Sequence, residues 1–186
     1  MGAATGKLVV LDRDGVINYD ADDYIKSPSQ WRALPGSLDA IARLHGAAYR
    51  VVVATNQSGV GRGLFSARSL ERINALMKRE VEAAGGALDG IYCCPHRPDE
   101  ACGCRKPAPG LLRRIERDFG QSLRGVPFIG DKLSDLDAAV AVGARPVLVR
   151  TGNGQRTCAA LGDRKAEIYA DLASAVAALL TERQAD

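Results

Sequence analysis

A short apolar run that ends in two aspartates constrains this chain most strongly. Residues 7–11 (KLVVL) are rich in branched apolar side chains, a pattern typical of strands that are buried on both faces of a parallel sheet. Asp12 and Asp14 follow directly, at the carboxyl end of the strand, where open α/β sheets bind their ligands, and Gly15 allows a sharp turn. Because two neighbouring carboxylates repel each other, the pair predicts a cation or a cationic substrate group. For this motif alone, an exposed aspartate-rich turn is the alternative.

Strand-like runs alternate with segments of helical periodicity along the whole chain. We expect strands at 7–11, 50–54, 88–93, 126–129, 146–149 and 168–170, and helices at 37–44, 67–84, 109–119, 133–142 and 172–180. This alternation predicts βαβ units and hence an α/β fold with a Rossmann-like, mostly parallel sheet and helices on both faces. The length of 186 residues favours one domain over residues 1–186. The segments from Asp12 to Thr55 and from Thr55 to Lys106 are too short to hold a cap domain in addition to these elements.

The composition excludes several classes of partner. The chain has 25 basic and 22 acidic residues, with no basic block, which argues against nucleic acid and leaves small anionic substrates open. No apolar run reaches the length of a membrane span, and residues 1–6 are too short and polar for a signal peptide, so we expect a cytoplasmic protein that does not bind membranes. A monomer is expected because no apolar seam is evident.

Three expected strands end in residues that carry chemistry. Asp12 and Asp14 follow the first, Thr55 and Asn56 the second, and Asp131 the fourth. Parallel strands bring these ends to one rim, where three carboxylates could hold Mg²⁺. The hydroxyl of Thr55 and the ammonium of Lys106 would then donate to phosphoryl oxygens. Such a set suits phosphoryl transfer, in which catalysis is mostly positioning and charge stabilisation.

A cysteine-rich loop at about residues 93–106 predicts a second metal site. Cys94, His96, Cys102 and Cys104 offer three thiolates and an imidazole, enough for a closed tetrahedral Zn²⁺ site with a structural role. Disulfides and free thiols are the alternatives. Cys93 should point to the opposite face of its strand and be buried, and Cys158 should be a core residue of a helix.

The motifs together resemble those of the haloacid-dehalogenase-like phosphatases. Asp12-x-Asp14-Gly15, Thr55 after a strand, Lys106, and Gly130-Asp131 with Asp135 occur in the order of that superfamily's four motifs. The resemblance implies that Asp12 is a nucleophile, that Asp14 is the general acid and base, and that Thr55 and Lys106 stabilise the phosphoryl group. It also implies a Mg²⁺ site made by the Asp12 side chain, the Asp14 main-chain oxygen and the Asp131 side chain. Asp135 would either support this site or cap a helix.

The phrases LDRDGVIN, TNQSGVGRG, CPH with CGCRKP, and GDKLSD narrow the resemblance to the family of heptose bisphosphate phosphatases. This resemblance implies a Mg²⁺-dependent phosphatase that removes the C7 phosphate of D-glycero-D-manno-heptose 1,7-bisphosphate during lipopolysaccharide biosynthesis. A histidinol-phosphate or other small phosphomonoester phosphatase is one alternative, and an inactive, zinc-stapled binding module is another. By the same resemblance, a flap at about residues 18–30 and three further segments contact the phosphorylated sugar, through Asp20, Asp22, Asp23, Tyr24, Asn56, Gln57, Ser58, Arg105 and Lys132. Arg62 is either a weaker candidate for anion binding or a loop residue.

Overall fold

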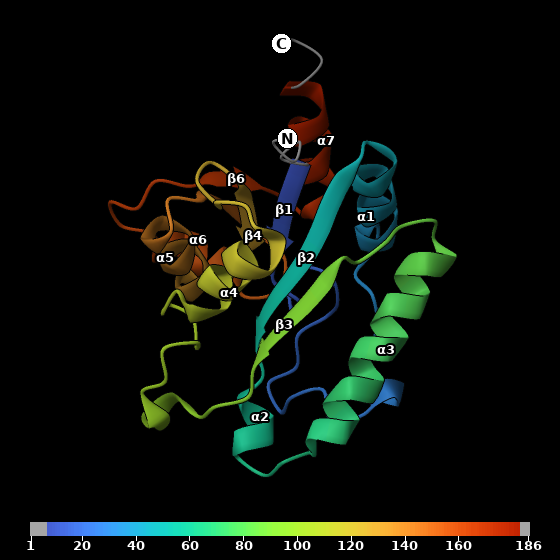
Figure 1. The fold of residues 1–186 in the computed structure, drawn as a ribbon, viewed down its shortest axis with the longest axis vertical. Coiled ribbons are helices and arrows are strands. Elements are labelled where there is room, and N and C mark those ends of the chain that lie inside the picture. The colour runs from blue at the N-terminus through green and yellow to red at the C-terminus, as the bar shows by residue number, and fades with distance from the viewer. Residues whose placement is uncertain (1–6, 183–186) are drawn as a thin grey trace.

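A parallel sheet forms the centre of the molecule (Figure 1). In the computed structural model, which describes residues 7–182, six strands lie in the order β3-β2-β1-β4-β5-β6, and each neighbouring pair is parallel. The strands are β1 Lys7–Leu11, β2 Tyr49–Asn56, β3 Gly90–Cys94, β4 Pro127–Gly130, β5 Arg145–Val149 and β6 Glu167–Tyr169. The expected parallel sheet is therefore confirmed. Residues 1–6, the segment judged too short for a signal peptide, lie outside the described residues.

Helices cover both faces of this sheet, as expected (Figure 1). The α-helices are α1 Ser37–Gly46, α2 Ser58–Gly61, α3 Ala67–Ala83, α4 Gly110–Phe119, α5 Leu133–Ala141, α6 Gly154–Ala159 and α7 Leu172–Glu182, and two 3₁₀ turns are η1 Pro28–Gln30 and η2 Pro98–Glu100. Helices α1, α3 and α7 contribute to the core on one face, and α4 and α5 contribute to the core on the other. The N-cap of α3 is Ser66, whose hydroxyl accepts a hydrogen bond from the Ser69 amide at 3.1 Å.

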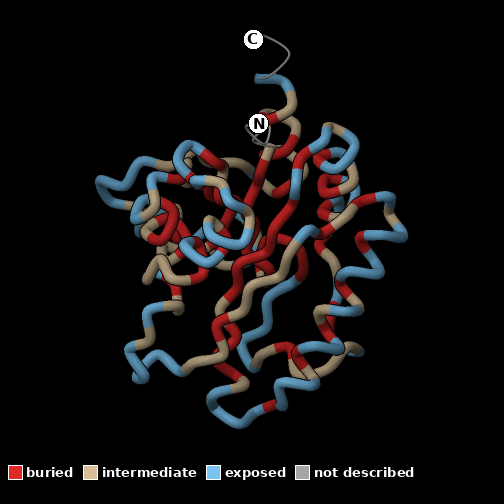
Figure 2. The backbone as a smooth tube through the Cα atoms, in the orientation of Figure 1, coloured by how far each residue is buried: buried red, intermediate tan, exposed pale blue. Residues whose placement is uncertain are grey.

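Two apolar layers sandwich the central strands. Figure 2 shows the strands as mostly buried, with exposed residues on the outer sides of the surrounding helices and in the loops. Along β1, Val9 and Leu11 pack into one layer, while Leu8 and Val10 pack into the other. This follows from the two-residue period of a strand, which sends successive side chains to opposite faces. Because β1 is buried on both faces, its side chains are apolar up to its carboxyl end, where Asp12 begins the loop.

Some element boundaries differ from those expected. Strand β2 continues to Asn56, so its polar end belongs to the strand, and β3 begins at Gly90 and includes Cys94. The short helices α2 and α6 were not expected, because four and six residues are too few to show a helical period. Cys158 lies in α6 but is only half-buried, so its expected place in the core was wrong. Cys93 is also half-buried, on the side of the sheet where Asn74 of α3 contacts it.

Neither interval between the motifs contains a cap domain in the described chain. The flap, η1, α1 and β2 fill the stretch from Asp12 to Thr55, and α2, α3, β3 and η2 fill the stretch from there to Lys106. Within residues 7–182, no helix has the length and apolar character needed to cross a membrane. Loops and the short helices α2 and α6, rather than a cap domain, follow the carboxyl ends of the strands.

Candidate active site

The ends of β1 and β4 bring two aspartates together. Leu11 pairs with Ile129, and the amide of Asp12 donates to the carbonyl of Ile129 at 2.9 Å, so Asp12 and Asp131 leave the sheet at the same edge. Gly15 turns the chain here with a φ of 85°, and a side chain at this position would overlap the Asp131 carboxylate. Only glycine permits both the positive φ and this close approach.

Lys106 lies at the centre of the site and is 3% exposed. Its Nζ is 3.0 Å from Asp12 Oδ1 and 2.6 Å from Asp135 Oδ1, and it donates to the Ala54 carbonyl at 2.7 Å. Burial lowers the pKa of Lys106, but the Asp12 and Asp135 carboxylates outweigh burial and hold the pKa above its ordinary value. The Asn56 side chain fixes the Lys106 backbone from both sides, accepting from its N–H at 3.1 Å and donating to its carbonyl at 3.0 Å.

Three buried carboxylates form a cluster with the composition of a hard-cation site. Asp12, Asp131 and Asp135 each place an oxygen within 4.8 Å of the others. Burial is the largest influence on the pKa of Asp131; Lys132 opposes it, but repulsion from Asp12 and Asp135 adds to it, and the pKa reaches about 7. Asp131 Oδ1 is buried without a hydrogen-bond partner. A buried carboxylate oxygen that accepts no hydrogen bond, lies 3.9 Å from the Lys132 ammonium and is close to two further carboxylates fits a bound cation.

Asp135 caps a helix and also belongs to the carboxylate cluster, while its support of a metal site stays a prediction. Its Oδ2 accepts hydrogen bonds from the amides of Asp131 and Lys132, at 3.2 and 3.0 Å, so it caps the first turn of α5. Its other oxygen pairs with Lys106. It therefore connects the helix terminus to the carboxylate cluster.

The Asp14 carboxylate is not part of this cluster and accepts hydrogen bonds from three side chains. Arg13 donates through Nε and Nη2, both at 3.0 Å, Asn18 at 2.9 Å and Gln57 at 2.7 Å. Burial raises the pKa of Asp14, but the Arg13 charge and these hydrogen bonds outweigh burial and hold it below its ordinary value. Gln57 also donates to the Thr55 hydroxyl at 3.0 Å, which links Asp14 to the end of β2.

A cavity of about 530 Å³ opens over this centre, and most of the expected substrate-binding residues line it. Its lining includes Asp14, Asp20, Asp22, Tyr24, Asn56, Gln57, Ser58, Arg105, Lys106 and Lys132. Asp23 is absent from that lining; its exposed carboxylate pairs with Lys26 at 2.6 Å. Arg62 is exposed at the end of α2 and is also absent from the lining.

The flap is attached to the opposite wall of this cavity through Asp20. Its Oδ2 is 2.9 Å from Lys132 Nζ and accepts from Asn153 Nδ2 at 3.0 Å. The backbone N–H of Asn153 also donates to Asp131 Oδ2 at 2.7 Å. Burial lowers the pKa of Lys132, but Asp131, then Asp12 and Asp20, outweigh burial and raise it. The flap is thus connected to Asp131 through two residues, Lys132 after β4 and Asn153 after β5.

The Cys94, His96, Cys102 and Cys104 side chains converge as expected. Their sulfur and Nδ1 atoms lie 3.2–3.6 Å apart in the five closest pairs. These sulfur separations exclude disulfides, which have S–S bonds of about 2.0 Å, and approach the roughly 3.3–3.8 Å expected between tetrahedral zinc ligands. The donor set and its spacing therefore fit Zn²⁺.

The cysteine loop leads directly into the catalytic rim. Burial raises the pKa of Cys102, but hydrogen bonds from Cys104 and from the Arg105 backbone outweigh burial and bring the pKa to about 7. The guanidinium of Arg105 donates to the His96 carbonyl at 3.5 Å, and Lys106 follows in sequence. The conformation of this loop therefore positions two of the three cations that line the cavity, Arg105 and Lys106.

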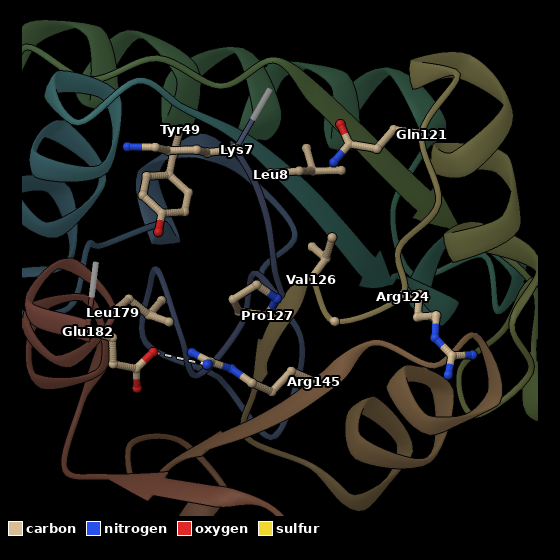
Figure 3. A pocket seen from close by; sticks show the side chains of 11 residues that line it. Lys7, Leu8, Tyr49, Gln121, Arg124, Val126, Pro127, Arg145, Leu179 and Glu182 are labelled. Carbon is tan, nitrogen blue, oxygen red and sulfur yellow. Dashed lines mark hydrogen bonds and ion pairs between the residues drawn. The ribbon is translucent and has the colours of Figure 1, made fainter. Parts of the chain in front are cut away.

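A cavity of about 320 Å³ at the amino ends of the strands has a different character (Figure 3). Lys7, Val126, Arg145 and Glu182 are among its lining residues, and Arg145 is already paired with Glu182 at 3.0 Å. Neither group of clustered metal-ligand side chains found in the described chain lies there. The chemistry is therefore concentrated at the carboxyl ends.

Comparison with known proteins identifies the family. A family model described as HAD-hydrolase-like matches residues 103–175. Over 177 residues the chain is 51% identical to the D-glycero-beta-D-manno-heptose-1,7-bisphosphate 7-phosphatase of Bordetella bronchiseptica, covering 95% of this chain and 99% of the relative. The chain belongs to the heptose bisphosphate phosphatase family of haloacid-dehalogenase-like hydrolases. The phosphatase of the same name from Pseudomonas putida is also 51% identical, over 168 residues that cover 90% of this chain and 96% of the relative.

A solved heptose bisphosphate phosphatase has the same fold. The crystal structure of the B. bronchiseptica D,D-heptose 1,7-bisphosphate phosphatase, complexed with magnesium and phosphate, superposes with a TM-score of 0.92 at 50% identity, covering 95% of this chain and 99% of that one. The chain is thus a phosphomonoester hydrolase, as the motifs imply.

Three residues of this phosphatase site escaped the sequence reasoning. Arg13 and Asn18 hold Asp14, and Asn153 joins Asp131 to the flap. The sequence carried a signal for Arg13 alone, because a cation stands there between Asp12 and Asp14. Asn153 follows β5 in an unremarkable loop, so its partners emerge only in the folded chain.

Proposed function

We propose that this protein removes the C7 phosphate of D-glycero-beta-D-manno-heptose 1,7-bisphosphate, in the biosynthesis of nucleotide-activated heptose for the lipopolysaccharide core. The observation that carries this proposal is the 51% identity, over nearly the whole chain, to relatives that bear this name. The site is compatible with it, because a buried carboxylate, a general acid and a buried ammonium lie around an open cavity.

A magnesium ion fits the carboxylate rim. Asp12, the Asp14 main-chain oxygen and Asp131 would hold it, and the buried Asp131 Oδ1, which accepts no hydrogen bond, supports this assignment. The relative of known structure is described with magnesium and phosphate. When bound, Mg²⁺ neutralises charge on the phosphoryl oxygens and on the surrounding carboxylates.

The reaction proceeds in two steps through the chain's own groups. An Asp12 carboxylate oxygen attacks phosphorus, the bond to the sugar oxygen breaks, and Asp14 gives that oxygen a proton, which leaves an aspartyl phosphate and a free alcohol. Asp14 then takes a proton from water as the water oxygen attacks phosphorus, and the Asp12 carboxylate leaves. Thr55 and Lys106 donate to the phosphoryl oxygens in both steps.

The second phosphate of the substrate is expected to meet the cationic wall of the cavity. Arg105 and Lys132 line it, and the planar guanidinium of Arg105 suits two phosphate oxygens. The flap residues Asp20, Asp22 and Tyr24 would contact the sugar, whereas the solvent-facing position of Asp23 gives it the weakest claim.

We propose a structural Zn²⁺ in the cysteine loop, held by Cys94, His96, Cys102 and Cys104. Four protein ligands leave no open position for catalysis. One domain over residues 1–186, a monomeric state and a cytoplasmic location stay predictions.

The two alternatives receive less support. The relatives described above favour a sugar bisphosphate over histidinol phosphate. An inactive binding module would not need Asp12, Asp14, Lys106 and Asp131, which are all present and gathered at one rim.

The decisive assay is phosphate release by the purified protein with Mg²⁺. The α and β anomers of heptose 1,7-bisphosphate, histidinol phosphate and a hexose monophosphate are compared by kcat/KM. The proposal requires a clear preference for the β bisphosphate with release of one phosphate, from C7. Preference for histidinol phosphate would refute the proposed substrate, and absence of turnover on all four would favour the binding module.

A further inference from the structure

Arg13 is a fully buried cation with no role in the steps described above. It is 0% exposed and is one of the largest side chains enclosed in the molecule. Removing a guanidinium from water is costly unless its hydrogen bonds are replaced. Its position between Asp12 and Asp14 in sequence therefore calls for an explanation from its contacts.

Those contacts hold the guanidinium between α3 and the catalytic loop. Its Nε and Nη2 donate to the two oxygens of Asp14, each at 3.0 Å, while Nη1 donates to Asn74 Oδ1 at 3.3 Å. Asn74 belongs to α3 and also donates to Cys93 Sγ at 3.5 Å. A planar fork that engages both carboxylate oxygens fixes the plane of the carboxyl group as well as its distance.

The two oxygens of Asp14 differ in their remaining donors. Oδ1 also accepts from Asn18, which is fully buried. Oδ2 also accepts from Gln57, which lines the substrate cavity. A carboxylate oxygen that already accepts two hydrogen bonds must lose one of these donors before it can bind a proton and donate that proton to another group. Gln57 is the donor that a substrate oxygen in the cavity can replace, whereas Arg13 and Asn18 are inaccessible from it.

We infer that Arg13 is a positioning residue for the acid and base Asp14: it holds the carboxyl group so that Oδ2 exchanges the proton with the substrate oxygen and with water. This inference rests on the proposed function. In the first step the proton on Oδ2 passes to the sugar oxygen as the P–O bond breaks, and in the second Oδ2 takes a proton from the attacking water. Arg13 itself touches no reacting atom.

The test measures how strongly P–O cleavage depends on the leaving group. Arg13→Lys keeps the charge but loses the two-point contact with the carboxylate. Pre-steady-state release of the alcohol or phenol is measured with the heptose bisphosphate and with phenyl phosphates of increasing leaving-group acidity. A poor alkoxide leaving group needs the proton, whereas p-nitrophenolate does not.

We expect Arg13→Lys to slow cleavage of the alkyl ester on the order of 100-fold, within the range of general acid catalysis, and to change p-nitrophenyl phosphate cleavage by less than about fivefold. Asp14→Asn is the reference, with the same selective loss and a larger amplitude. Asn74→Leu removes the support behind the guanidinium, together with the contact to Cys93, and leaves Arg13 itself in place, so it should show a smaller loss with the same selectivity. Circular dichroism shows whether each variant folds. If Arg13→Lys does not fold, the selectivity of Asn74→Leu tests the inference in its place.

An equal loss on alkyl and aryl esters in the folded variants, or no loss, would overturn the positioning role. Failure of the proposed function has a different signature. If Asp14→Asn itself shows no selectivity for the leaving group, the assignment of Asp14 as the acid fails. If Asp14→Asn is selective while Arg13→Lys and Asn74→Leu are not, only the inference about Arg13 fails.

Discussion

The Lys106 ammonium lies between two carboxylates and a backbone carbonyl, almost without exposure to solvent. In this position it offsets part of the negative charge of the cluster even before substrate arrives. Its orientation does not depend on its own side chain alone, because Asn56 holds the backbone on both sides. A residue that resemblance identifies as a phosphate ligand is therefore also part of the structure that holds Asp12, the proposed nucleophile.

Lys106→Met should lower the free energy of unfolding by about 3–5 kcal/mol, because it leaves Asp12 and Asp135 buried without their cation. Urea denaturation at pH 7 measures this change. Lys78→Met is the matched control: Lys78 is exposed and its nitrogen is 3.9 Å from Glu82, so a change below about 1 kcal/mol is expected. Similar losses in the two variants would contradict a central role for the Lys106 ion pairs.

Asp12→Asn should reduce kcat on the order of 10⁴-fold or more, because an amide is not a competent nucleophile and a lost nucleophile has effects of that size. Trapping of the phosphoenzyme in acid quench, together with kcat, measures this. Retained turnover with a trapped phosphoryl group elsewhere would contradict the covalent route through Asp12.

At this scale the sequence located the groups that carry charge but not the groups that orient them. The charged residues could be predicted because each follows a strand or a turn signal in the sequence, namely Asp12, Asp14, Lys106 and Asp131. The link from Asn56 to the Lys106 backbone joins residues 50 positions apart and depends on how the cysteine loop folds. Local patterns carry no information about such a contact.

Among the elements, the flap and the cysteine loop replace a cap domain as the covering of the site. The flap is held across the cavity by Lys132 and Asn153 through Asp20. The cysteine loop is connected to the wall through Arg105. Substrate selection is therefore expected to depend on these two loops.

Asp20→Asn should raise KM several-fold, because it removes the ion pair with Lys132 and loosens the flap. Asp23→Asn is the matched control on the same loop, and its KM should stay within about twofold, because Asp23 faces solvent and pairs with a surface lysine whose contribution is small. Steady-state kinetics on the heptose bisphosphate measures both. Equal effects would indicate that the charge of the flap matters, rather than its attachment.

Removal of zinc should lower the melting temperature and speed amide hydrogen exchange around residues 94–106, since the loop has few apolar side chains to fold on. The kcat/KM should fall as Arg105 and Lys106 lose their fixed positions, and re-addition of Zn²⁺ should restore it. Cys102→Ser is expected to behave like the zinc-depleted protein. A depleted protein with unchanged exchange and full activity would contradict this account of the loop.

The long elements followed from the sequence, whereas their ends depended on tertiary pairing. Strand β2 extends to Asn56 because β3 pairs with it there, opposite Cys94. Apolar periodicity ends earlier, at Ala54, and so the strand was predicted to stop too soon. The short helices α2 and α6 have the same explanation, since neighbouring loops support segments that have little helical propensity of their own.

For the whole molecule, the carboxylate cluster makes stability depend on pH and on cations. The folded-state pKa of Asp131, about 7, lies above its ordinary value, so the folded state binds more protons than the unfolded state between about pH 4 and 7. The contribution of this group to stability is therefore greatest below about pH 4 and is lost as the pH rises towards 7. Binding of a cation should compensate for that loss.

We expect the free energy of unfolding of the Mg²⁺-free protein to fall across this pH range, and millimolar Mg²⁺ to reduce the fall. Asp131→Asn should flatten the dependence. Urea titrations between pH 4.5 and 7.5, with and without Mg²⁺, test this without a chelator that would also remove zinc. A profile that is identical in the wild type and in Asp131→Asn would show that another group is responsible.

The strand order has a consequence for synthesis on the ribosome. Strand β1 is made first, yet it lies between β2 and β4, and Asp131, which lies beside the proposed nucleophile Asp12, follows β4. Until β4 and the first turn of α5 have left the ribosome, the nascent chain contains Asp12 but neither Asp131 nor Asp135 beside it. During that time the edge of β1 that will pair with β4 is unpaired. Catalytic competence must therefore arise late in translation, and until then the newly made half needs protection from pairing with other chains.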